Sequence, residues 1–245
     1  MVKKGILTGL LFAFFLVSGV KSAIANEDDA NSVTTESSFS TNSEMIYHDI
    51  KVNSEVSVPS LEVFSTAMKG FKNLVDFSKV KKNILSVIDF SLPSTVTRLW
   101  VIDLNTKEVL INDHVAHGRN SGDNVAIKFS NVPNSKTSSM GFYITAEKYI
   151  GKHGLSLRLD GMDKGYNDNA RKRAIVMHGA DYVSTDFIER YGRLGRSLGC
   201  PAVSMHIHED LINTIHGGSV LFIYSEDYNF MKKSPVLNPK LPLEK

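Results

Sequence analysis

The segment 173–203 most constrains the fold, because it holds the only cysteine of the 245-residue chain, Cys200, and a histidine, His178, that ends a short apolar run. Residues 174–177 are all apolar, which favours a buried strand, and Gly179 then allows a sharp turn at the strand exit. Three glycines between positions 192 and 199 interrupt the approach to the cysteine, which favours an irregular loop. We therefore expect a histidine at a strand end and a cysteine on a loop.

The chemistry of these two residues leaves two interpretations open. A thiol is a strong nucleophile only as a thiolate, and its ordinary pKa is about 8.5, so an adjacent His178 would activate Cys200. If His178 is an imidazolium, Cys200 should react fast in mildly acidic buffer. Pro201 has no N–H, so donors to an oxyanion would come from Cys200 and the residues just before it. Alternatively, a lone cysteine is a small core residue and the histidine a satisfied strand end.

Five further motifs accompany the pair in order along the chain: VAHGRNSG at 115–122, FSN at 129–131, SSMGFY at 138–143, NDNA at 167–170 and GRLGRSLGCPA at 192–202. His178-Gly179, seventeen residues, and then Ser197-Leu198-Gly199-Cys200 resemble the signature H-G, spacer, S/T-H-G-C of the L,D-transpeptidases. With the other motifs, most of 84–224 resembles the murein L,D-transpeptidase catalytic domain family.

The resemblance implies a fold, a mechanism and a substrate. The fold would be mostly β with a few short helices, an L,D-transpeptidase-like β-sandwich with the cysteine at one end of a cleft. Cys200 would be the acyl-accepting nucleophile, His178 its base, and the carbonyl of Gly179 would orient the imidazole. The substrates would be peptidoglycan stem peptides, with no cofactor. The same site would also serve an L,D-carboxypeptidase or crosslink hydrolase, and a non-catalytic wall-binding domain is a third alternative.

Five residues are candidates for binding the oxyanion or the substrate: Gly199, Ser197, Arg196, His117 and Asn169. The sequence departs from the wider superfamily at Leu198, where a histidine is expected, and at Pro201-Ala202, where an apolar residue and an arginine are expected. Arg196 either replaces the missing positive charge or is a solvated surface residue.

The other two candidates also have structural alternatives. His117 lies in a glycine-flanked turn near the expected cleft, so it either contacts substrate or only shapes the turn. Asn169 stands beside Arg171 and Arg173, which suit a peptide carboxylate, but it can equally shape a loop.

The N-terminal region has the pattern of an export signal. Residues 1–25 combine two lysines, an apolar run and a small-x-small cleavage site ending at Ala25, as secretory signal peptides do. We expect an exported, periplasmic protein that begins at Asn26 and has no stable membrane insertion after cleavage; an uncleaved anchor is the alternative. Residues 26–59 are rich in serine, threonine, asparagine and acidic residues, which predicts a disordered linker.

The remaining chain predicts one catalytic domain over 60–235 and a tail over 236–245. Apolar residues at helical spacing predict one or two helices in 60–82, interrupted near Gly70, and two shorter helices at 185–191 and 205–215. Strands are expected at 84–90, 98–103, 107–116, 125–129, 141–145, 155–159, 174–177 and 219–224.

The net charge and the spacing of the histidines argue against nucleic acid and metal ions as ligands. The net charge of +2 is too small to force a nucleic-acid partner. His206 and His208 are two residues apart on an expected helix, so they face different directions and predict no metal site. We expect a monomer.

Overall fold

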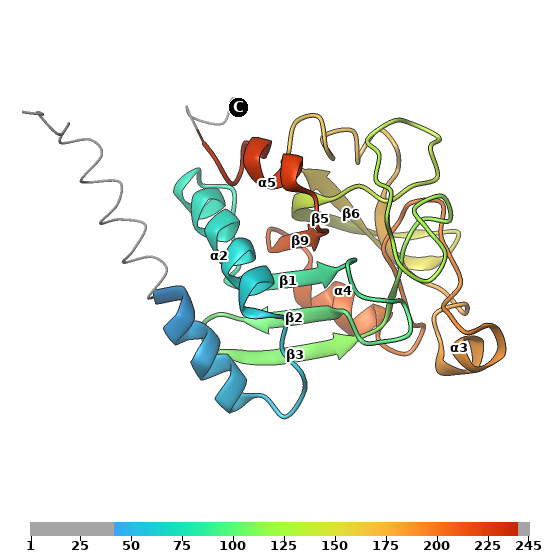
Figure 1. The fold of residues 1–245 in the computed structure, drawn as a ribbon, viewed down its shortest axis with the longest axis horizontal. Helices are drawn as coiled ribbons and strands as arrows, with labels where there is room; N and C mark the ends of the chain where they lie inside the picture. The colour runs from blue at the N-terminus through green and yellow to red at the C-terminus, as the bar shows by residue number, and fades with distance from the viewer. Residues whose placement is uncertain (1–41, 240–245) are drawn as a thin grey trace, which may run out of the picture. The chain divides into compact units, whose positions relative to one another are not determined.

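Within residues 42–239, nine strands form one hydrogen-bonded sheet in the order β3-β2-β1-β9-β5-β6-β7-β8-β4. Figure 1 labels six of them, β1, β2, β3, β5, β6 and β9. The computed structural model describes residues 42–239, so the expected signal peptide and residues 26–41 of the expected linker lie outside the described residues. The strands are β1 (Ile84–Asp89), β2 (Leu99–Asp103), β3 (Glu108–Asp113), β4 (Val115–Ala116), β5 (Gly141–Gly151), β6 (Gly154–Gly161), β7 (Val176–Gly179), β8 (Ala202–Val203) and β9 (Val220–Tyr224). The predicted fold class, mostly β with a few short helices, is confirmed.

The centre of the sheet is buried on both faces. Strands β1 and β9 run parallel, with Val87 opposite Phe222. Because side chains alternate along a strand, Val87 and Phe222 enter one core layer and Ile88 and Ile223 enter the other. Each layer is closed by a helix.

Helix α2 (Leu61–Asp76) covers the first core layer (Figure 1). The side chain of Ser60 caps it by accepting the N–H of Val63, as serine does at helix starts. The predicted interruption at Gly70 is absent, and the helix continues through it. Gly70 lies against the ring of Phe142, and a Cβ at this position would come within 2.1 Å of that ring. This glycine allows close packing of the helix on the sheet.

The other three helices of the described chain that are labelled in Figure 1 are short: α3 (Thr185–Tyr191), α4 (His208–Ile215) and α5 (Tyr228–Lys233). Helix α4 buries Leu211 and Ile212 in the second core layer. It begins later than predicted, since Ser204 does not cap it and instead donates to Asp113 at 3.0 Å. None of the helices within 42–239 is long and apolar enough to cross a bilayer.

The predicted disordered linker and C-terminal tail are both wrong where they adjoin the domain, because residues at those ends pack on it. Residues 42–53 are helical, and Ile50 from this helix is fully buried in the first core layer. Trp100 Nε1 then fixes the following segment by donating to Ser57 O at 2.8 Å. At the other end Val236 and Leu237 are buried in the same layer. Residues 26–59 were predicted to be disordered because most of them are polar, and this average does not reveal a single buried apolar residue such as Ile50.

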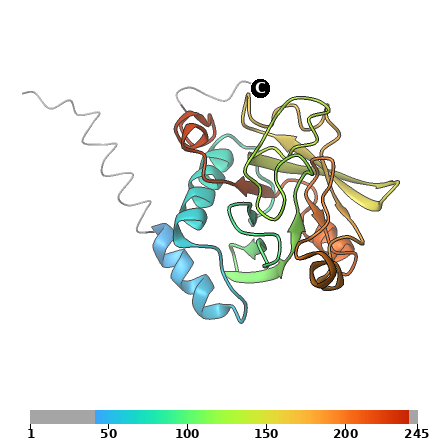
Figure 2. The same ribbon diagram turned by 45° about the vertical axis from the view of Figure 1, so that its right-hand side comes forward.

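Three predicted strands also differ from the structure. Residues 125–129 form no strand, because the loop from 117 to 139 is instead tied together by contacts such as Ile127 N to Ser121 O at 2.9 Å. Strands β5 and β6 are longer than predicted and form a hairpin, drawn in yellow, that projects to the right in Figure 2. Its tip is a two-residue turn, since Gly151 pairs with Gly154.

Candidate active site

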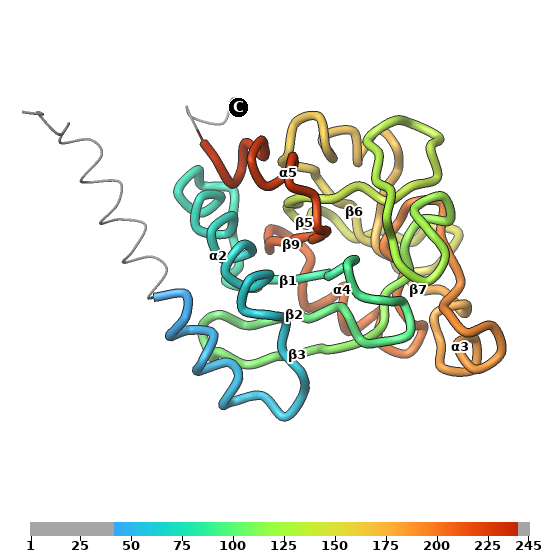
Figure 3. The backbone as a smooth tube through the Cα atoms, viewed as in Figure 1, coloured from blue at the N-terminus to red at the C-terminus, as the bar shows by residue number. Residues whose placement is uncertain are grey.

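Strands β7 and β8 bring His178 and Cys200 to one place in the molecule. The two strands are parallel, with His178 opposite Ala202, and β7 lies near α3 and α4 (Figure 3). Cys200 precedes Ala202 by two residues and reaches Val176, whose N–H donates to the Cys200 sulfur at 3.5 Å. Since residues two apart on a strand share a face, Val176 and His178 present their side chains on the same side.

Both residues line a cavity of about 450 Å³. Its wall comes from the β5–β6 hairpin, the start of β7 and the cysteine loop: Tyr149, Lys152, His153, Ser156, Arg173, Ala174, Ile175, Val176, His178, Tyr182, Arg196, Ser197, Leu198 and Cys200. Of the described residues, none that lines this cavity is an aspartate or glutamate, whereas three are lysine or arginine. The cavity therefore combines a thiol, imidazoles and positive charge.

The imidazole of His178 is held in one tautomer. Its Nδ1 lies 2.9 Å from the carbonyl oxygen of Gly179, and because a carbonyl only accepts, Nδ1 must carry the proton. Nε2 is then left with a lone pair and can accept a proton. The ring is buried, which lowers the pKa of His178 below its ordinary value, and the neighbouring His153 and Lys152 act in the same direction. His178 is thus a neutral base at neutral pH.

Gly179 is a glycine for a reason other than the expected turn. It stays within β7, and a Cβ at this position would lie 2.7 Å from Met205 Sδ and 2.8 Å from His208 Cγ. The absent side chain lets the segment before α4 pack against the strand that carries His178.

The thiol of Cys200 is half-buried and rests on backbone groups. It donates to Ala174 O at 3.7 Å as well as accepting from Val176 N. Burial raises the pKa of Cys200, and the contact with Val176 and the charges of Arg173 and Lys152 offset this only in part. The resting pair is therefore a neutral thiol with a neutral imidazole, and the imidazolium–thiolate pair expected from the sequence is not the favoured state.

Gly199 and Ser197 shape the cysteine loop and donate nothing to the cavity. Gly199 has a φ of +125°, and a Cβ there would come within 2.7 Å of Thr137 O. Its N–H donates to Ser197 Oγ at 3.0 Å, and that hydroxyl donates to Cys200 O at 2.6 Å. The prediction that these two residues hold the oxyanion is therefore corrected, since their donors are used inside the loop. The N–H of Cys200 remains as the backbone donor without a partner among the described residues.

Arg196 lines the cavity, but its guanidinium is engaged beside it. Nη1 donates to Gly122 O at 2.9 Å and lies 3.1 Å from a carboxylate oxygen of Asp123. Arg193 pairs with the same carboxylate at 2.9 Å. The positive charge of Arg196 is thus partly neutralised and is a weak replacement for the missing superfamily arginine.

The structure does not bring His117 or Asn169 into the cavity. The His117 side chain is 1% exposed, and its Nδ1 accepts from Arg98 Nη2 at 2.9 Å. Burial and then the Arg98 charge lower the pKa of His117 to about 4. Asn169 donates through Nδ2 to Asn131 O at 3.2 Å and so braces a loop. Both were candidates for substrate binding, and the structure places both side chains outside the cavity, in agreement with the alternative that each shapes its own loop.

The sequence left Arg173 open between binding a carboxylate and shaping a loop, and the structure gives it a bracing role. Its guanidinium donates to Ser130 O at 2.6 Å and Thr137 O at 2.8 Å, and it also contacts the hydroxyls of Ser135 and Ser139. It thereby holds the loop against which Gly199 packs. The cavity residues that sequence reasoning missed are Tyr149, Lys152, His153, Ser156 and Tyr182. No sequence motif marks them, because four of the five lie on the β5–β6 hairpin, far along the chain from Cys200, and only the fold brings that hairpin to the cavity.

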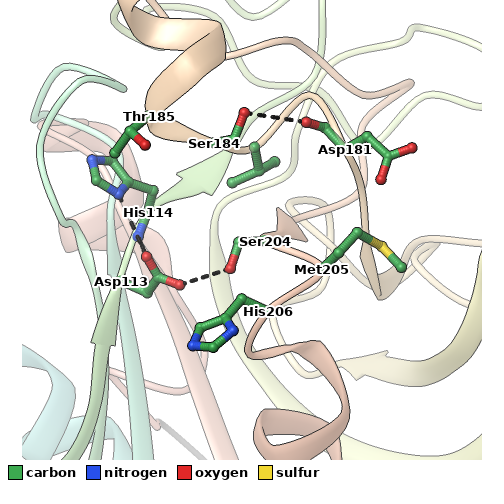
Figure 4. Close-up of a pocket in the computed structure, with 9 residues that line it drawn as sticks. Asp113, His114, Asp181, Ser184, Thr185, Ser204, Met205 and His206 are labelled. Atoms are coloured by element: carbon green, nitrogen blue, oxygen red, sulfur yellow. Dashed lines mark hydrogen bonds and ion pairs between the residues drawn. The ribbon is translucent and has the colours of Figure 1, made fainter.

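A second cavity of about 430 Å³ lies between the end of β3, the start of α3 and the segment after β8 (Figure 4). Asp113 and Ser204 face one another across it, and Asp113 also accepts the backbone N–H of His114 at 2.7 Å. His206 lines this cavity, yet nowhere in residues 42–239 do three or more histidine, cysteine, aspartate or glutamate side chains gather to hold a metal ion. The second cavity contains no thiol.

The comparisons with known proteins agree with this architecture. The model of the L,D-transpeptidase catalytic domain matches residues 55–224, which is more than half of the chain. The chain therefore belongs to the L,D-transpeptidase catalytic domain family. A search of curated proteins found no significant match.

Three solved structures illustrate what this chain is similar to. They are an L,D-transpeptidase from Mycobacterium smegmatis (14% identity, TM-score 0.36, 59% of this chain and 59% of that chain), the helical cell shape determining protein Pgp2 from Campylobacter jejuni (10%, 0.40, 66% and 57%) and an L,D-transpeptidase from Stackebrandtia nassauensis (10%, 0.36, 68% and 68%). This chain thus spans 59% of the length of the Mycobacterium smegmatis protein. The family model, and not these distant likenesses, carries the family assignment.

Proposed function

We propose that this protein is a peptidoglycan L,D-transpeptidase that works through a thioester on Cys200. The observation that carries the proposal is the cavity in which the Cys200 thiol and the His178 imidazole stand together, with Nδ1 of the imidazole tied to Gly179 O and Nε2 left free. Membership in the L,D-transpeptidase family supplies the substrate class, the stem peptides of peptidoglycan.

In the first half-reaction, Nε2 of His178 takes the proton of the Cys200 thiol, which turns away from Ala174 as it does so. The thiolate attacks the carbonyl carbon of the L-centre residue in the donor stem peptide, and the backbone N–H of Cys200 donates to the oxyanion that forms. His178 then passes its proton to the nitrogen of the departing D-residue. The products are a thioester on Cys200 and a free D-amino acid.

In the second half-reaction, an amine of a neighbouring stem peptide attacks the thioester, and His178 accepts the proton that the amine loses. The new amide bond forms as the bond from carbon to sulfur breaks, and the thiol is restored. Water can replace the amine, which would make the protein an L,D-carboxypeptidase or a crosslink hydrolase. The lining of the cavity favours the amine, because no carboxylate among the described residues stands there to activate water.

The products formed from tetrapeptide muropeptides test this proposal. We expect crosslinked dimers from the full-length protein and none from its Cys200→Ala and His178→Ala variants. His206→Ala is the matched control, because His206 is an exposed histidine of the second cavity. If only shortened monomers appear at high acceptor concentration, the hydrolytic function replaces the transferase. If the Cys200→Ala variant is as active as the parent, the thioester mechanism is wrong.

We also propose that the protein acts in the periplasm of a bacterium after losing residues 1–25. The support is the signal-peptide pattern of the sequence, which lies outside the described residues. The intact mass of the exported protein should correspond to a chain beginning at Asn26. A mass that still includes Lys3 and Lys4 would favour a membrane anchor instead.

A further inference from the structure

The tip of the β5–β6 hairpin reaches the proposed active site from a distant part of the sequence. Lys152 and His153 are the two residues of its turn, and both line the cavity that holds Cys200. Gly154 has a φ of +75°, a left-handed conformation that suits glycine at the end of so short a turn. Gly151 packs against the ring of Tyr149, where a Cβ would come within 2.9 Å. The turn is therefore tightly defined.

His153 anchors this turn on the imidazole of the proposed base. The rings of His153 and His178 stack with centroids 4.4 Å apart and an interplanar angle of 20°. His153 itself is exposed, while His178 is only 4% exposed. The His153 ring thus shields His178 from water and fixes the hairpin tip beside the reacting groups.

Lys152 is the cation of the cavity that remains available to a ligand. Arg173 is bound to the loop from 130 to 139, and Arg196 is paired with Asp123. Lys152 is exposed and has no hydrogen-bond or ion-pair partner among residues 42–239. An ammonium on a flexible stem suits a single carboxylate.

We infer that Lys152 is a specificity-determining residue that binds the terminal carboxylate of the donor peptide, with His153 holding the turn in place. The inference rests on the proposed function, because that function makes the departing residue the last of the donor chain. Its carboxylate is then one residue from the bond that Cys200 attacks, closer than any other fixed negative charge of the donor. Lys152 lies near both reacting groups, since it lines the same cavity as Cys200 and His178.

The test compares two donor peptides that differ only at the terminus, a tetrapeptide ending in a free carboxylate and the same peptide ending in an amide. Binding is measured by calorimetry on the full chain carrying Cys200→Ala, with and without Lys152→Gln. We expect Lys152→Gln to weaken binding of the acid about tenfold, the lower end of the range for a hydrogen bond to a charged group, and to leave binding of the amide unchanged. Lys152→Arg should restore most of the preference.

Lys148→Gln is the matched control, because Lys148 lies on the same hairpin but donates to Asn213 at 2.7 Å. Equal loss of acid binding in both variants, no loss in Lys152→Gln, or no preference for the acid in the parent protein would each overturn the inference. The binding measurement needs no turnover. If the acid preference depends on Lys152 but the parent protein forms no product, the proposed function fails and the carboxylate site stands. If dimers form equally well with Lys152→Gln at limiting donor concentration, the proposed function stands and the role of Lys152 is wrong.

Discussion

Two of the four His-Gly dipeptides in the chain, His117-Gly118 and His178-Gly179, pair with the cysteine loop and the strand after it, and they have different roles. His117-Gly118 lies beside Ser197, whose N–H donates to His117 O at 2.9 Å, and His178-Gly179 pairs with Ala202-Val203. Both imidazoles are buried and both have lowered pKa values. The difference is in the ring nitrogens.

At His117 both ring nitrogens face protein groups. Nδ1 accepts from Arg98, and Nε2 lies 3.4 Å from Gly122 O. At His178 only Nδ1 is used, by the carbonyl of its own neighbour, and the ring borders the cavity that Cys200 shares. Burial makes both histidines neutral, but only a neutral histidine with a free nitrogen beside a thiol can act as its base.

The largest expected effect separates the two histidines by activity. His178→Ala should lower kcat of dimer formation by about 10²- to 10⁴-fold, because it removes the proposed general base. The thermal midpoint should change little by comparison. Steady-state rates and thermal unfolding of the same samples measure both. A His178→Ala variant with near-normal kcat would show that the two dipeptides do not differ in the way proposed.

The second effect is on stability. His117→Ala should lower the free energy of unfolding by about 1–3 kcal/mol, because it leaves one donor of the buried Arg98 without an acceptor. Activity per folded molecule should be largely retained. Urea unfolding monitored through Trp100 gives the stability, and His206→Ala provides the baseline of an exposed histidine. Loss of activity without loss of stability would show that His117 acts in substrate binding and not in stabilising the fold.

The third effect concerns pH. The pKa of His178 is lowered below its ordinary value by burial and then by its cationic neighbours, and the base must be neutral to act. The acid limb of kcat/KM should therefore fall below pH 6.5, the ordinary histidine value. His153→Ala should move this limb to higher pH, because water then reaches the ring and raises its pKa. A profile that does not move would contradict the shielding assigned to His153.

The smallest effect is on thiol reactivity. Because burial raises the pKa of Cys200, iodoacetamide should alkylate it more slowly than it alkylates free cysteine at the same mildly acidic pH. His178→Ala should alter this rate only slightly, since the resting imidazole is neutral. The alkylation rates are measured by intact mass over a range of pH, for the parent protein and for free cysteine. Alkylation faster than that of free cysteine would establish the ion pair that the sequence suggested.

Local pattern predicted much of the framework and some of the site. The apolar runs of β1 and β9 and the helical spacing in α2 are short-range signals, and the elements formed where they were expected. The irregular course of residues 125–129 and the helix at 42–53 were missed, because the loop that contains the first is held by Arg173 and the second depends on the burial of Ile50 in the core. Such contacts join residues that the sequence separates by dozens of positions.

The sequence by itself determined the family and singled out the pair that we propose is catalytic, since Cys200, His178 and their glycines stand at a fixed spacing along the chain. Only the tertiary structure decided which neighbours complete the site. It buried His117 against Arg98, tied Asn169 to Asn131, paired Arg196 with Asp123, and brought Lys152 and His153 to the cavity at the end of a hairpin. The physical reason is that a side chain's role depends on which polar groups and charges surround it after folding, and that surrounding is assembled from strands far apart in the chain.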